Sequence, residues 1–156
     1  MRRLYFSALL MVGLAAALAL YLAPLQPGVL ALQLAWQPRA FGAIIHVWPA
    51  EHLARYRAHL PFDFLLIAAY AVFGHACVSC TRWFASCAAW VQRSAKFALP
   101  LAGVFDGLEN LLHYWLTAAP RFGVPELYAL AAACAALKWL LLFGFALALL
   151  WVLARE

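Results

Sequence analysis

Four long apolar stretches alternate along the chain with shorter segments rich in proline, tryptophan and charge. The stretches run approximately over residues 4–23, 61–80, 97–118 and 126–153. Each is close to the roughly 20 helical residues that a hydrocarbon core requires. Unpaired backbone polar groups are costly in lipid, so each stretch should form a helix. The pattern predicts an all-α fold, a single-domain integral membrane bundle of four transmembrane helices.

The segment of residues 24–60 is the longest one outside these stretches. Pro24 and the turn that follows it should end the first helix, because proline and glycine interrupt helical geometry. Pro38 and Pro49 each suit a first helical position, which predicts two short helices. Both carry apolar residues along one side, so we expect them to lie on the membrane surface.

The second of these short helices, residues 50–60, places three polar side chains on one face. They are His52, Tyr56 and His59. Histidines on a surface helix are usually solvated, as we expect for His52, His59 and the nearby His46. This helix therefore predicts no binding site.

Composition and charge agree with a membrane protein. Of the 156 residues, 69% are hydrophobic and 11% are charged, against about 25% charged in a typical soluble domain. The net charge of +5 does not indicate nucleic-acid binding, because the basic residues form no continuous patch. Their distribution favours cytoplasmic N- and C-termini in a bacterial inner membrane, with residues 24–60 outside the cytoplasm and the loop of residues 81–96 inside.

The first apolar stretch also resembles a signal peptide, since Arg2 and Arg3 precede it and small residues follow at 15–19. Its apolar run exceeds the roughly 7–15 residues of a typical signal-peptide core. We expect a retained anchor. Cleavage would leave three transmembrane helices.

Polar residues inside the third and fourth stretches need a physical reason, because a charge near the bilayer centre costs about 2.5–3.5 kcal/mol. Asp106, Glu109, Asn110 and His113 follow one another at i, i+3, i+4 and i+7, so they share one helix face. Lys138 lies in the fourth stretch. A rise of about 1.5 Å per residue puts Asp106 and Lys138 at the same depth, which predicts an ion pair.

Two residues of the second stretch extend this polar face. Tyr70 comes out level with Glu109 and Asn110, while Asp63 and His113 lie nearer the non-cytoplasmic surface. The sequence therefore predicts a polar column between the second, third and fourth helices, opening toward that surface.

The column has several interpretations. It can be structural, because buried polar contacts hold membrane helices together. It can also bind a polar headgroup or a proton, or act on a lipid-soluble substrate with Glu109 or Asp106 as base and His113 exchanging protons with water. A metal site would use Glu109, His113, Asp106 and Asp63. The chain has no paired His-x-x-x-His, and Lys138 would oppose a cation, so we expect no metal and no cofactor.

A Cys-x-x-Cys pair, Cys77 and Cys80, has the spacing of thiol–disulfide enzymes. The expected topology places it on the cytoplasmic side, where thiols stay reduced. Thiol oxidoreductase activity is therefore a remote alternative.

Residues 27–142 resemble a widespread group of small bacterial four-helix membrane proteins. The segments that carry the resemblance are Pro27–Ala35, Phe62-Asp63-Phe64-Leu65 with Tyr70, Asp106-Gly107-Leu108-Glu109-Asn110, and Leu137-Lys138-Trp139. The chain departs from that group at Gln33, where an acidic residue is usual, and in its Cys77/Cys80 pair. The resemblance implies a four-helix fold and no particular activity.

The sequence thus favours a small polytopic membrane protein that binds lipid, another membrane protein or a second copy of itself through its helices. The alternative is an integral membrane enzyme that acts on a lipid-soluble substrate in the polar column.

Overall fold

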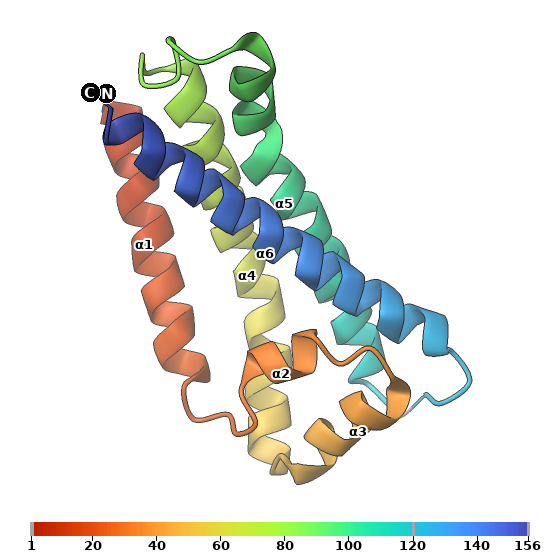
Figure 1. The fold of residues 1–156 in the computed structure, drawn as a ribbon. Coiled ribbons are helices and arrows are strands. Elements are labelled where there is room, and N and C mark those ends of the chain that lie inside the picture. The colour runs from red at the N-terminus through yellow and green to blue at the C-terminus, as the bar shows by residue number, and fades with distance from the viewer. Residues whose placement is uncertain (1, 120, 156) are drawn as a thin grey trace.

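A computed structural model describes residues 2–119 and 121–155, and this part of the chain is all-α. Its six helices are α1 (Arg2–Leu22), α2 (Val29–Gln33), α3 (Pro38–Val47), α4 (Ala50–Ser79), α5 (Ala89–Leu116) and α6 (Pro125–Leu153). The four long helices form a bundle, and α2 and α3 lie across one end of it (Figure 1). The chain ends and the α4–α5 connection lie at the opposite end.

Three of the described helices, α1, α4 and α6, are long and apolar enough to cross a membrane. The sequence predicted four such helices, so α5 is the exception. It has 28 residues, which is long enough. Its row of polar residues from Asp106 to His113 lowers its mean hydropathy, and the expectation of four spans is supported for three helices only.

The long helices pack in the order α1, α4, α5 and α6, with α6 running obliquely across the bundle (Figure 1). Between α4 and α5 the backbones come close at Gly74, where an added Cβ would lie 2.6 Å from the Cβ of Leu99. Glycine at this position lets the two helices approach, as small residues do between membrane helices generally.

The predicted break before Pro61 is wrong. Residues 50–60 are the first three turns of α4, and Pro61 lies inside this single helix. A proline inside a helix removes one backbone hydrogen bond. In transmembrane helices such a loss is tolerated where neighbouring helices support the segment. Tyr56 and Leu60, in the turns just before the proline, are both buried, so packing holds the helix through this point.

The first turns of α4 therefore belong to the bundle instead of lying on the membrane surface. Likewise, α5 begins at Ala89 instead of near residue 97, which shortens the predicted loop of residues 81–96 to residues 80–88. The prediction that Pro38 begins a helix is confirmed by α3.

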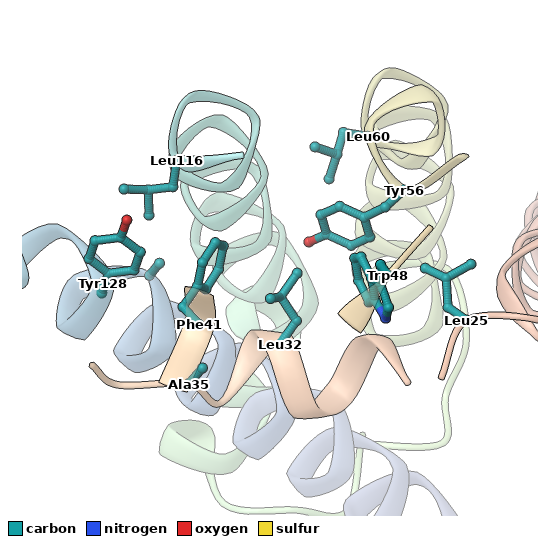
Figure 2. Close-up of a cluster of buried hydrophobic side chains, with 10 residues drawn as sticks. Leu25, Leu32, Ala35, Phe41, Trp48, Tyr56, Leu60, Leu116 and Tyr128 are labelled. Carbon is teal, nitrogen blue, oxygen red and sulfur yellow. The ribbon is translucent and has the colours of Figure 1, made fainter. Parts of the chain in front are cut away.

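A cluster of buried apolar side chains joins α2 and α3 to the bundle (Figure 2). Phe41 from α3 lies beside Tyr128 of α6, with ring centroids 5.0 Å apart. Trp48 packs on Tyr56 of α4 and donates a hydrogen bond of 3.0 Å to the carbonyl oxygen of Pro27. The segment between α1 and α4 thus folds back as a cap over one end of the bundle.

A hydrogen bond between side chains also holds α2 against α6. Trp139 of α6 donates through its indole nitrogen to the side-chain oxygen of Gln33, at 3.2 Å. An acidic residue at position 33 would also accept this bond.

Candidate functional site

The ion pair predicted between α5 and α6 is present. Lys138 Nζ lies 2.9 Å from Asp106 Oδ1 and donates a hydrogen bond to it. The same ammonium lies 2.6 Å from Glu109 Oε2. Glu109 is fully buried, and Asp106 and Lys138 are 5% and 3% exposed. One ammonium thus faces two carboxyl groups, one turn apart on α5, in the interior of the bundle.

The two carboxyl groups differ in their other partners. The Tyr70 hydroxyl on α4 donates to Asp106 Oδ2 at 2.9 Å, so both oxygens of Asp106 accept a hydrogen bond. Glu109 has Lys138 as its one close polar partner among the described residues, through Oε2, and its Oε1 has none. Asp106 therefore has a donor at each of its two oxygens, whereas Glu109 has Lys138 at one oxygen only.

One turn beyond Asp106 along α5, Asn110 binds Asp63, which the sequence analysis placed nearer the surface, and not Tyr70, which it placed level with Asn110. Its side-chain amide donates to Asp63 Oδ2 of α4 at 2.8 Å. Asn110 is buried and Asp63 is partly exposed. This contact ties α4 to α5 and orients both side chains.

The polar face of α5 ends at His113, whose Nδ1 lies 2.5 Å from the Tyr56 hydroxyl in a hydrogen bond. His59 donates from its own Nδ1 to the Tyr56 carbonyl oxygen. The sequence missed Tyr56 and His59 as members of this group. Their common helix face was visible, but the break assumed at Pro61 assigned that face to the membrane surface.

The column does not open toward the nearby end of the bundle. His113 is 1% exposed instead of reaching bulk water, because the cap covers it. Phe41 of α3 stands edge-on to His113, with ring centroids 5.3 Å apart. The polar residues of α4, α5 and α6 are therefore covered at the His113 end of the bundle.

No three histidine, cysteine, aspartate or glutamate side chains gather closely enough to share a metal ion in residues 2–119 and 121–155. Lys138 occupies the position between the two carboxyl groups that a cation would take. The geometry gives no support to the metal interpretation.

A cavity of about 680 Å³ lies beside the network, between α3, the C-terminal end of α5 and the start of α6. Its walls are mostly apolar and include Phe41, Leu116 and Tyr128. Its charged lining residues are Arg39 and Arg121, and no carboxylate is among its lining residues in the described chain. The sequence did not predict this cavity, because its walls come from three segments that only folding brings together.

The guanidinium of Arg121 is held in place by an aromatic ring. Its Cζ lies 3.9 Å from the ring centroid of Trp115, a cation–π contact. Its Nε is buried and has no hydrogen-bond partner among the described residues. A positioned donor of this kind at the wall of an apolar cavity is suited to an anionic group, which arginine binds through its fork of N–H donors.

The two cysteines of the Cys-x-x-Cys pair lie at the end of α4, and both are free thiols. Cys77 is fully buried against the helices around it, while Cys80 is exposed. A thiol–disulfide exchange needs access to the sulfur under attack, so the burial of Cys77 disfavours that alternative.

Comparisons with protein-family models, curated proteins and solved structures found no match. The resemblance to a group of small bacterial membrane proteins stays a prediction.

Proposed function

We propose that this chain is a small four-span membrane protein that binds an anionic, lipid-like amphiphile in the cavity beneath its α2–α3 cap. The cavity carries the proposal. Its apolar walls suit an acyl or isoprenoid chain, and Arg39 and Arg121 suit a phosphate or carboxylate headgroup. Ligand pockets typically combine such apolar linings with a few placed polar groups.

The distribution of side chains on α5 supports a fourth span. Its polar residues face α4 and α6, while its outward face carries large exposed apolar side chains. These are Phe97, Leu101, Val104, Leu108 and Leu111, spaced three or four residues apart. A helix with a buried polar face and an apolar outer face is suited to lipid, because intramembrane polar residues face the bundle interior. Its average hydropathy hides this asymmetry.

The ends of the helices support the expected topology. Four spans return the chain to the side where it began, and the two chain ends lie at the same end of the bundle (Figure 1). We place that end in the cytoplasm of a bacterial cell and the cap on the far side of the inner membrane. The packing of α1 on α4, with Leu4 and Ser7 buried, supports a retained anchor.

The cavity would then lie at the membrane boundary, where an amphiphile keeps its chain in the apolar walls and its headgroup near water. Arg121 lies just before α6 begins and just after α5 ends, which places its charge at headgroup level. The polar network does not line the cavity, so we favour binding over catalysis.

Native mass spectrometry tests the proposal on protein released gently from its own membrane. We expect one retained phospholipid or other anionic amphiphile per chain in the wild type. Loss of both charges in an Arg39→Gln/Arg121→Gln variant should reduce its occupancy at least several-fold.

Arg155→Gln is the matched control. Arg155 also stacks on a tryptophan, with its Cζ 4.3 Å from the ring centroid of Trp151, at the other end of α6. Its loss should leave occupancy unchanged. A wild-type protein without bound amphiphile, or equal occupancy in all three proteins, would contradict amphiphile binding in this cavity. A bound polypeptide in its place would favour an accessory subunit.

A further inference from the structure

The charges inside the bundle do not balance if every carboxyl group is ionised. Asp106 and Glu109 both contact Lys138, so two negative charges would face one positive charge. Asp63 of α4, which is hydrogen-bonded to Asn110 of α5, would add a third negative charge. An unpaired ion buried in apolar surroundings is far more costly than a neutral polar group. The imbalance requires a further positive charge or a proton.

Hydrogen bonding indicates which carboxyl group is neutral. A carboxylate only accepts hydrogen bonds, and both oxygens of Asp106 do so, from Lys138 and from Tyr70. Asp63 accepts from Asn110 and is partly exposed. Glu109 is fully buried, its Oε2 shares the Lys138 ammonium with Asp106, and its Oε1 has no hydrogen-bond partner in the described chain. An unpartnered hydroxyl costs less there than an unpartnered carboxylate oxygen.

We propose that the interior of the bundle is a proton-binding site and that Glu109 holds the proton. Asp106 and Lys138 then form a neutral ion pair, and the Glu109 carboxyl group lies beside it without charge. The site takes a proton instead of a metal ion because Lys138 already fills the space between the two carboxyl groups.

The groups that face Glu109 come from three helices. They are Tyr56, Asp63 and Tyr70 on α4, Asp106 on α5, and Cys134 and Lys138 on α6. Tyr70 donates to Asp106, and His113 is paired with Tyr56, so neither competes for the proton in this arrangement. This inference is independent of the cavity and its ligand.

Infrared spectroscopy tests the proposal on the full chain in lipid bicelles. A protonated carboxyl group has a C=O stretch that is separate from the carboxylate bands. We expect this band at neutral pH in the wild type and its loss in Glu109→Gln, an isosteric neutral variant. Glu126→Gln, which removes an exposed glutamate in the first turn of α6, should keep the band.

Isotope labelling keeps the test valid if Glu109→Gln does not fold. In wild-type protein grown with ¹³C-carboxyl glutamate the band should shift, and with ¹³C-carboxyl aspartate it should not. Absence of the band at neutral pH, its persistence in folded Glu109→Gln, or a shift with labelled aspartate alone would each overturn the assignment to Glu109.

Discussion

Lys138 holds two carboxyl groups in place, so its removal should affect the fold more than any other single change in the network. Truncating one partner of a buried ion pair leaves an uncompensated charge, at a cost of about 3–5 kcal/mol. We expect Lys138→Met to lower the free energy of unfolding by about that amount, or to abolish accumulation of the protein. Thermal unfolding in detergent measures the effect.

The double variant Asp106→Asn/Lys138→Met removes both charges of the pair and should recover a substantial part of the lost stability. Neutral replacement of a whole buried pair is often tolerated where single removal is not. Equal or greater destabilisation of the double variant would show that Asp106 and Lys138 are not energetically coupled.

At the scale of single residues, helix periodicity and depth were enough to predict the Asp106–Lys138 contact, because each residue lies within a continuous helix that rises about 1.5 Å per residue. The same reasoning could not place Tyr56 beside His113. That contact depends on a helix that continues through Pro61, and single-residue propensities favour a break there. Nor could it find that Phe41 covers His113, because Phe41 arrives from a separate segment.

At the scale of the helices, Gly74 is the described glycine at which an added Cβ would lie closest to a neighbouring helix. A methyl group there would meet the Cβ, Cγ and Cδ1 atoms of Leu99 at 2.6 Å. We expect Gly74→Ala to destabilise the protein by about 1–3 kcal/mol, as overpacking does in other well-packed interiors. The change in melting temperature measures this.

Gly144→Ala is the matched control, because Gly144 is also helical and a Cβ added there would meet no atom within 4 Å. Alanine favours helix over glycine by about 1 kcal/mol. This variant should therefore be neutral or slightly more stable. Similar effects of both substitutions would mean that α4 and α5 are not in close contact at Gly74.

The sequence predicted the position and the apolar character of most of the long helices. Three of the four predicted apolar stretches are helices apolar enough to span a membrane, and α6 begins and ends within a residue of its predicted bounds. The fourth, α5, carries both an apolar and a polar face, so its hydropathy averaged along the helix is too low for it to be recognised as a membrane span. Its start at Ala89 was missed because the whole of residues 81–96 was assigned to a cytoplasmic loop.

At the scale of the whole molecule, the two chain ends lie at the same end of the bundle, and they therefore face the same side of the membrane. The distribution of basic residues supplies the orientation that we propose. Thiol labelling at two positions distinguishes this orientation from the inverted one. Cys80 is exposed at the end of α4 near the chain ends, and Gln26 is exposed in the turn before α2 at the other end.

A membrane-impermeant maleimide applied to intact bacterial cells should label a Gln26→Cys variant in which Cys87 is replaced by serine. With Cys87 replaced in the same way and Gln26 kept, it should label Cys80 only after the membrane is permeabilised. Cys77 and Cys134 are buried and serve as internal controls that stay unlabelled until the protein is denatured. Labelling of Cys80 from outside, with Gln26→Cys protected, would invert the topology. It would place the cap and its arginine-lined cavity at the cytoplasmic surface, where anionic lipid headgroups could still bind.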